Sequence, residues 1–333
     1  MVARTVAVMS IVPIRPLRRG AVPGGLAVAF LSAAAFGVAG TLATSLLRSG
    51  WTPGAAVAAR LVVAVVALAV PAWRSMRGHW SGLRGSAPTV AAYGLLAVAG
   101  AQLCYFQAIQ HLSVAVALLL EYSGTLLVVA WMWARHHQVP SRVTAMGAVL
   151  AMAGLVLVLD LTGDHHLDVV GILWGLGAAI GLAAYFIVSA DADEPLPPLA
   201  VAWGGLAVGA TAIVVAAAVG ALRWRAPLVD VTLAHSRVSW LVPVLAIGVV
   251  AAALAYATGI IAARVLGARM ASFVGLAEVL CAAIYARALL GERLAPVQML
   301  GGLLVLAGIA VVRAGEPATA APVVEMELLE PAA

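Results

Sequence analysis

Ten long apolar segments dominate this 333-residue chain and limit what it can fold into. A helix needs about 20 apolar residues to cross a hydrocarbon core of about 30 Å, and the segments reach or approach that length. The runs are continuous and rich in Ala and Leu, whereas strands of a membrane barrel alternate apolar and polar residues. The expected helices are Gly24–Leu47, Pro53–Trp73, Thr89–Gln110, Ser113–Ala134, Arg142–Leu159, Val169–Ala190, Pro198–Leu222, Ser239–Ala263, Ala268–Leu290 and Pro296–Arg313.

Composition predicts the same class of protein. Hydrophobic residues make up 64% of the chain, charged residues 10%, and the mean hydropathy is +1.08. A soluble domain carries about a quarter charged residues. We therefore predict an all-α integral membrane protein with ten transmembrane helices. Cys104 and Cys281 lie inside apolar segments without metal-ligand spacing, so neither a metal nor a cofactor is expected.

The two halves of the chain are similar to each other. The segment 148–155 resembles the segment 302–309, which lies 154 residues later. Because each repeat has five helices, an odd number, the second repeat must enter the membrane upside down, and such repeats place substrate sites near the midplane. The expected parts are a cytoplasmic N-terminal segment (1–23), two repeats (24–160 and 168–313) and a disordered acidic tail (314–333).

Arginines predict the orientation in the membrane. With a cytoplasmic N-terminus, nine Arg fall in or beside the inner loops of the first five helices, whereas the outer loops hold only Arg48. The second half does not agree, but early helices usually dominate, so both termini are expected in the cytoplasm. The net charge of +5 is spread between apolar segments, which favours a topology signal over a nucleic-acid surface. The nine are Arg4, Arg15, Arg18, Arg19, Arg74, Arg77, Arg84, Arg135 and Arg142.

Glu121 and Glu278 each stand alone near the middle of an apolar segment. Each lies about nine residues, or about 13 Å, from the start of its helix, which places both near the centre of the membrane. A carboxyl group there would face hydrocarbon unless it lines a polar interior, so it marks a candidate functional site. The alternative is an interhelical hydrogen bond that fixes packing. The two residues are 157 apart, which requires a three-residue difference in the connection if they are equivalent.

Other polar and aromatic residues within the spans are candidates for lining the same cavity. Arg60 lies about eight residues into the second helix, and structural pairing is preferred for it over substrate contact. The glycines of Gly171-xxx-Gly175 and Gly177-xxx-Gly181 are expected to let helices approach closely. The candidates for substrate binding or coupling, besides the two glutamates, are Tyr122, Gln102, Tyr105, Gln107, Trp174, Tyr185, Tyr256 and Ser272.

The motifs around Glu278 carry a family resemblance. Leu276-Ala277-Glu278-Val279, Leu289-Leu290-Gly291-Glu292-Arg293-Leu294 and the Gly-rich last helix resemble an EamA-type carrier of the bacterial drug/metabolite transporter superfamily. The Pro that follows the family's glutamate is replaced by Val279 here, and by Tyr122 in the first repeat, which removes an expected kink. The resemblance implies ten helices in two inverted five-helix repeats that carry small metabolites or drugs, often as exporters.

Two other functions stay open beside a carrier. An intramembrane transferase could use the acidic loop Asp191–Glu194, and a helix-bundle receptor or scaffold is the third possibility. A carrier uses the internal duplication to exchange outward and inward states, whereas an enzyme or receptor need not have it. Adjacent His165 and His166, near Asp164 and Asp168, could bind a metal but are more typical of a solvated loop. For the carrier, the expected partners are a small-molecule substrate and the lipid bilayer of the cytoplasmic membrane. Protons and a second copy in a homodimer are open alternatives, and no nucleic acid is expected.

Overall fold

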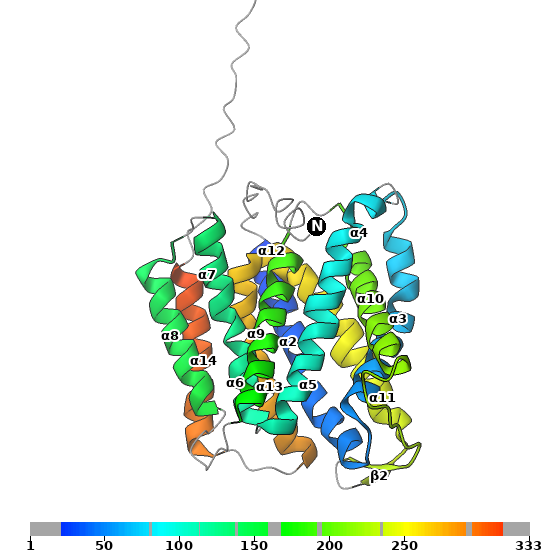
Figure 1. Ribbon diagram of the computed structural model, residues 1–333. Helices are drawn as coiled ribbons and strands as arrows, with labels where there is room; N and C mark the ends of the chain where they lie inside the picture. Colours follow the sequence, from blue (N-terminus) through cyan, green and yellow to red (C-terminus); the bar gives the residue numbers. More distant parts are fainter. Residues whose placement is uncertain are drawn as a thin grey trace, which may run out of the picture.

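The protein is a bundle of helices that run roughly parallel to one another (Figure 1). The computed structural model describes residues 21–79, 82–112, 114–136, 139–158, 168–191, 195–233, 236–290 and 295–315, so the expected N-terminal segment and acidic tail lie almost entirely outside the described residues. The first half contains α2 (Ala21–Arg48), α3 (Pro53–Ser75), α4 (Leu83–Ala92), η2 (Tyr93–Gly100), α5 (Ala101–His111), α6 (Val114–Tyr122), α7 (Gly124–His136) and α8 (Arg142–Val158).

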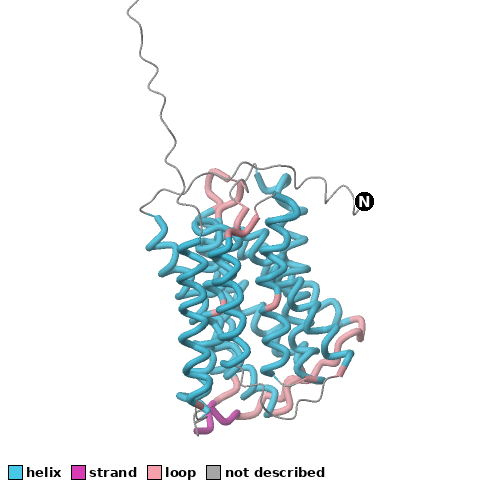
Figure 2. Tube along the Cα trace, turned by 90° about the vertical axis from the view of Figure 1, so that its left-hand side faces the viewer, coloured by secondary structure: helices cyan, strands magenta, loops and turns pink. Residues whose placement is uncertain are grey.

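The second half repeats this pattern with one addition. A two-stranded antiparallel hairpin precedes its third span, and Figure 2 shows the hairpin at one end of the bundle. The elements are α9 (Val169–Ser189), α10 (Pro198–Ala218), β1 (Val231–Leu233), β2 (Ser236–Val238), α11 (Leu241–Gly248), η3 (Val249–Leu254), α12 (Ala255–Gly275), α13 (Ala277–Leu290) and α14 (Pro296–Gly315).

The expected all-α membrane architecture is confirmed. Eight described stretches are long and apolar enough to cross a membrane, and α8 is a further, shorter apolar helix. One of the eight, Leu241–Gly275, includes parts of two expected helices, because α12 continues through Gly267 with a backbone φ of 79° and ψ of 161°. Glycine adopts a positive φ without steric cost, so the chain can turn there between two spans. The second of these spans is completed by α13, which brings the spans among the described residues to ten.

The packing of α8 against α14 reveals the symmetry of the bundle. A Cβ atom on Gly147 would lie 2.6 Å from the Val312 nitrogen, and one on Gly301 would lie 2.5 Å from the Val158 nitrogen. Adding 154 to Gly147 gives Gly301, and subtracting 154 from Val312 gives Val158. The repeat operation therefore exchanges the two contacts, as a two-fold axis does. The helices are antiparallel, since the start of α8 meets the end of α14, so this axis lies in the membrane plane.

The same register holds at the third and fifth spans of the two repeats, which corrects one expectation. Helices α8 and α14 begin at Arg142 and Pro296, which are 154 residues apart, and η3 falls on residues 95–100 of η2 when shifted by the same number. A three-residue difference in the connection is therefore absent. In this register Glu121 corresponds to Gly275, and Glu278 corresponds to Gly124. The two glutamates are not equivalent residues of the two repeats, although they lie close to equivalent positions.

Both helices that carry a glutamate are interrupted beside it. The fourth span breaks at Ser123, between α6 and α7, and the ninth breaks at Leu276, between α12 and α13. Proline is absent from both sites. At the first break the Ser123 hydroxyl donates to the Leu120 carbonyl, which replaces part of the lost helical bonding. Both helices are thus interrupted at the places where the family's proline is missing.

Candidate functional site

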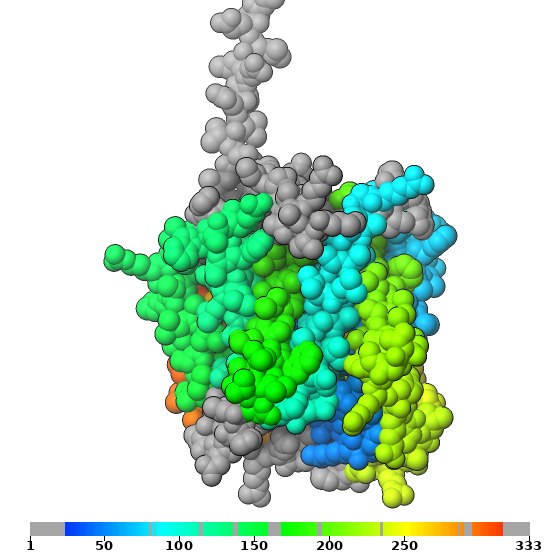
Figure 3. Space-filling view, viewed as in Figure 1, coloured from blue at the N-terminus to red at the C-terminus, as the bar shows by residue number. Residues whose placement is uncertain are grey.

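A cavity of about 70 Å³ lies inside the bundle, between helices of both repeats. A buried water needs about 10–15 Å³ by this kind of measure, so the cavity has room for a handful of waters or a compact solute. On the outer surface of the bundle, α9 packs between α7 and α5, and Figure 3 shows this face. The apolar part of the lining is Ala29, Ala33, Phe36, Ala97, Ala101, Leu182, Phe186, Gly259, Ala262, Ala271 and Gly275, and the polar part is Ser32, Gln102, Glu121, Tyr122, Tyr185, Tyr256 and Glu278.

The two helix breaks bring the two glutamates into this cavity. Glu121 lies in the last turn of α6, two residues before the break at Ser123, and Glu278 lies in the first turn of α13, two residues after the break at Leu276. The Tyr122 hydroxyl donates a hydrogen bond to the Glu278 carboxyl. A residue of one repeat thus holds the glutamate of the other.

Arg60 lies behind the cavity wall and carries the opposite charge. Its side chain is 3% exposed, and one guanidinium NH₂ group donates to the Gln102 Oε1 at 2.6 Å while the other donates to the Ala251 carbonyl. Ala251 belongs to η3, a π-helix, and π-helical turns often occur at functional sites. The guanidinium interacts electrostatically with Tyr256, Glu278 and Glu121, although Arg60 does not line the cavity.

Aromatic rings form one wall of the cavity. The ring of Phe36 meets Tyr256 edge to face with centroids 5.1 Å apart, and the rings of Tyr185 and Tyr256 lie 5.6 Å apart. Phe186 packs on Tyr185 at 4.9 Å. These edge-to-face pairs are the favoured arrangement of aromatic rings. Gly259 makes the cluster possible, because the Tyr185 hydroxyl occupies the space that a Cβ would fill.

The cavity therefore collects part of the set of residues named from the sequence. Six of them line it: Glu121, Glu278, Tyr122, Gln102, Tyr185 and Tyr256. Four others do not, namely Tyr105, Gln107, Trp174 and Ser272. The ring of Tyr105 packs on Phe106, Gln107 accepts from Gln110, and the Ser272 hydroxyl donates to the Arg269 carbonyl.

Sequence reasoning missed the contribution of α2. Ser32, Phe36 and two alanines of this helix, Ala29 and Ala33, line the cavity, and Ser32 Oγ donates to the Ala255 carbonyl at 2.8 Å. A hydroxyl in mid-helix was a usable signal for Ser32. Phe36 and Phe186 lie in apolar segments where a phenyl ring does not stand out, so nothing in the sequence separates them from residues that face lipid.

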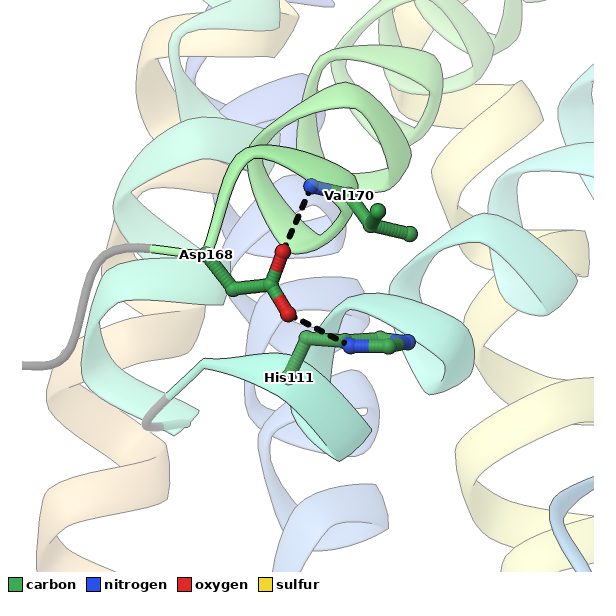
Figure 4. Close-up of polar contacts among 3 residues, drawn as sticks. All are labelled: His111, Asp168 and Val170. Atoms are coloured by element: carbon green, nitrogen blue, oxygen red, sulfur yellow. Dashed lines mark hydrogen bonds and ion pairs between the residues drawn. The ribbon is translucent and has the colours of Figure 1, made fainter.

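Another polar contact joins the two repeats at one end of the bundle (Figure 4). His111, the last residue of α5, donates from Nδ1 to Asp168 Oδ2 at 2.9 Å, and Asp168 Oδ1 caps α9 by accepting from the Val170 amide at 2.8 Å. The Val170 amide and then the His111 side chain hold the pKa of Asp168 below its usual value. Both carboxylate oxygens are used in this way.

The described residues contain no group of three metal-ligating side chains. His165, His166 and Asp164, considered above as metal ligands, lie outside the described residues. The same holds for Asp193 and Glu194 of the acidic loop that a transferase would use. The packing role expected for the α9 glycines is confirmed, since a Cβ on Gly175 would lie 2.6 Å from Leu120 and one on Gly177 would lie 2.9 Å from the Cys104 sulfur.

Ten apolar spans in two inverted repeats, with charged groups gathered around an internal cavity, define a multi-pass membrane protein of the transporter type. Residues 23–160 and 169–314 each match the EamA-like transporter family. The chain belongs to this family, which is part of the drug/metabolite transporter superfamily.

The chain is also similar to two individual proteins. The chain is 27% identical over 180 residues to the "Uncharacterized transporter YwfM" of Bacillus subtilis (strain 168), an alignment that covers 53% of this chain and 60% of that relative. The match thus spans less than two thirds of the relative's length. A protein of known crystal structure has a TM-score of 0.72 at 19% identity, with 87% of this chain and 96% of the other covered, which is a likeness of fold alone.

Proposed function

We propose that this protein is a secondary transporter that moves a small metabolite or drug across the cytoplasmic membrane by alternating access, with the cavity as the substrate site. The observation that carries the proposal is that Glu121 and Glu278, from opposite repeats, line one internal cavity beside two helix breaks. A buried carboxyl group is costly in a membrane interior, and a substrate or a proton that neutralises it is a physical reason to keep it there.

The symmetry of the bundle supports alternating access. The contacts between α8 and α14 exchange under the repeat operation, so the two repeats can swap their roles with little change in packing. The cavity is small and lies between the repeats, where movement of one repeat against the other would open it to one side at a time. A receptor or scaffold needs neither the symmetry nor the cavity.

Orientation and direction belong to the same proposal. Most arginines of the described spans lie near the end of the bundle where α3 ends and α8 begins, and we assign this end to the cytoplasm. Both termini would then be cytoplasmic. Transport outward, as an exporter, is the direction that the family resemblance implies.

Transport by reconstituted protein tests the proposal. Purified protein in liposomes is screened with a panel of small metabolites and drugs, with and without a pH gradient. We expect Glu121→Gln, which keeps shape but cannot titrate, to reduce transport by at least about tenfold, and Glu278→Gln to reduce it less. Asp168→Asn is the matched control, because it makes the same chemical change outside the cavity. If both cavity variants moved substrate at the parental rate across pH 5 to 8, the glutamates would be packing residues.

A further inference from the structure

The connection between α10 and α11 is longer than the fold requires. It runs over residues 219–240, whereas its counterpart in the first repeat, between α3 and α4, runs over residues 76–82. A few residues are enough to join two neighbouring helices, so the inverted repeats do not need the additional chain. We call residues 219–240 the strap. It includes the β1–β2 hairpin and lies at the end of the bundle where α3 begins (Figure 2).

Hydrogen bonds and ring contacts hold the strap against the connection between α2 and α3. The Thr52 amide donates to the Arg225 carbonyl at 2.9 Å, and the Arg225 amide donates to the Thr52 hydroxyl at 3.1 Å. Trp51 Nε1 donates to the Pro227 carbonyl at 2.9 Å, and the Trp51 ring lies 6.0 Å from the Trp240 ring. The exposed side chains of the strap are therefore presented by a fixed backbone.

Three large apolar side chains of the strap are exposed. Trp224 is 54% exposed, Leu228 67% and Val229 51%. Exposed apolar residues within the spans face lipid, but these three lie in the connection between two spans. Tryptophan is enriched at the interface between membrane and water, so the strap is suited to rest on the bilayer surface. The turns that flank the strap are apolar and exposed as well, at Val214 and Val215 of α10 and at Leu241 and Val242 of α11.

Arginines accompany these apolar side chains. Arg223, Arg225 and Arg237 belong to the strap, and Arg48 ends α2 at the same end of the bundle. All four are exposed, and no described residue forms a hydrogen bond or an ion pair with any of their guanidinium groups. Asp230 is the single acidic residue in the sequence of the strap. This surface is therefore strongly positive as well as apolar.

The strap arginines are the part of the charge pattern that orientation does not explain. Arginine is enriched in cytoplasmic loops, yet the strap lies at the end of the bundle opposite the one assigned to the cytoplasm. Guanidinium groups bind phosphate through paired, charge-assisted hydrogen bonds. Phosphate groups of lipids lie at the level of the membrane that exposed tryptophan also favours. A phospholipid therefore matches both the apolar and the charged side chains of the strap.

We propose that the strap binds phospholipids with an anionic headgroup, its arginines on the headgroup and its exposed apolar side chains among the upper acyl chains. A zwitterionic headgroup carries its own positive charge, whereas an anionic one leaves a negative charge for the arginines to neutralise. The strap residues do not line the internal cavity, so this lipid site is separate from the proposed substrate site. Through Thr52 and Trp51, the lipid would be linked to the first repeat as well as to the second.

Fluorescence quenching by brominated lipids measures which lipid lies beside Trp224. Full-length protein is reconstituted in phosphatidylcholine vesicles, in which a rising fraction of the lipid is replaced by brominated phosphatidylglycerol or by brominated phosphatidylcholine, with bromine near the headgroup. The signal of a Trp224→Phe variant is subtracted, so that Trp224 alone is observed. We expect phosphatidylglycerol to be preferred by about fivefold or more, the effect of one arginine at a headgroup. High salt should weaken this preference.

Paired variants assign the preference to the strap. Arg223→Gln combined with Arg225→Gln should bring the two lipids to within about twofold of each other. Arg74→Gln combined with Arg77→Gln is the matched control, because it removes the same charge from exposed residues at the other end of the bundle. The control should keep the parental preference. Thermal unfolding in detergent checks that both variants are folded, and the result with the parent does not depend on either.

Three outcomes would overturn the inference. The first is equal quenching of Trp224 by the two lipids in the parent, and the second is a preference that the strap variant keeps or that the control loses equally. The third is loss of the preference when inorganic phosphate is added in excess, beyond the effect of sodium chloride at the same ionic strength, since the arginines would then bind free phosphate instead of lipid. Transport enters none of these measurements, so the proposed function is tested separately.

Discussion

A charged side chain inside a membrane is tolerated only where the protein supplies what water would supply. Arg60 illustrates this, because its guanidinium donates to an amide oxygen and to a backbone carbonyl that belongs to a π-helix. The Tyr122 hydroxyl donates a hydrogen bond to Glu278, and the positive charge of Arg60 interacts with both glutamates. The polar residues of the cavity are thus one electrostatic unit, although they come from six different helices.

Asp168 offers a residue-scale prediction outside the membrane. Because the Val170 amide and His111 lower its pKa in the folded state, Asp168 stabilises the fold at pH values above the unfolded value of about 3.9, and this contribution is lost as the pH falls through the lowered value. Asp168→Ala should therefore unfold at a lower temperature than the parent at pH 7. The difference should shrink below about pH 4.

Thermal unfolding in detergent, measured from pH 3 to 7, checks this. A difference between Asp168→Ala and the parent that stayed constant over the whole range would show that the ionised carboxylate is not what stabilises the start of α9. Val170→Ala is a suitable comparison, since it keeps the amide that Asp168 accepts from and changes only an exposed side chain.

Among the elements, α8 and α14 pack most closely, and four glycines permit it. Gly147 and Gly154 on α8 and Gly301 and Gly308 on α14 each lie against the backbone of the other helix. Small residues at such interfaces let membrane helices gain van der Waals contact that lipid does not provide. This pair connects the repeats at a distance from the cavity, since neither helix contributes to its lining.

Gly308→Ala tests this interface, and Gly40→Ala is its control. Both replace a glycine inside a helix, so both gain about 1 kcal/mol of helix propensity. A Cβ on Gly308 would lie 2.5 Å from the Ala151 nitrogen, whereas a Cβ on Gly40 would meet nothing within 4 Å. We expect Gly308→Ala to lower the unfolding temperature and the folded yield, and Gly40→Ala to leave both unchanged or raise them. If the two variants had the same unfolding temperature and folded yield, the close packing of α8 against α14 would not contribute to stability.

At this scale the sequence predicted more than it did for single residues. Segment length and hydropathy are properties of about 20 residues each, so the spans emerge even though α10 ends at Ala218 and not at Leu222. The two breaks could not be predicted, because Ser123 and Leu276 interrupt their helices without proline. The cavity contribution of Phe36 depends on which face of α2 meets the other helices, and α2 is apolar nearly all round.

The sequence offered two registers for the repeats and did not decide between them. The similarity of segments 148–155 and 302–309 gave the correct shift of 154, but the conspicuous glutamates suggested a second shift of 157. The contacts between α8 and α14 support the shift of 154 residues. Because the glutamates are not related by symmetry, they can have different partners, and the unequal losses of transport expected for Glu121→Gln and Glu278→Gln follow from that difference.

For the whole molecule, two inverted repeats around one cavity make a strict demand under alternating access. A residue of the cavity must be reachable from each side of the membrane in turn. Ser32 is suited to report this, because it lines the cavity, is 5% exposed and differs from cysteine by one atom.

The decisive measurement is the labelling of a Ser32→Cys variant by a membrane-impermeant maleimide. Cys104 and Cys281 are first replaced by Ser, and the reagent is then applied to right-side-out and to inside-out vesicles. Denatured protein, which should label fully, gives the reference. Alternating access predicts that Cys at position 32 reacts from both sides, and that Gly40→Cys, away from the cavity, does not share this pattern. Reaction from one side only, or from neither at saturating reagent, would contradict a carrier that works through this cavity.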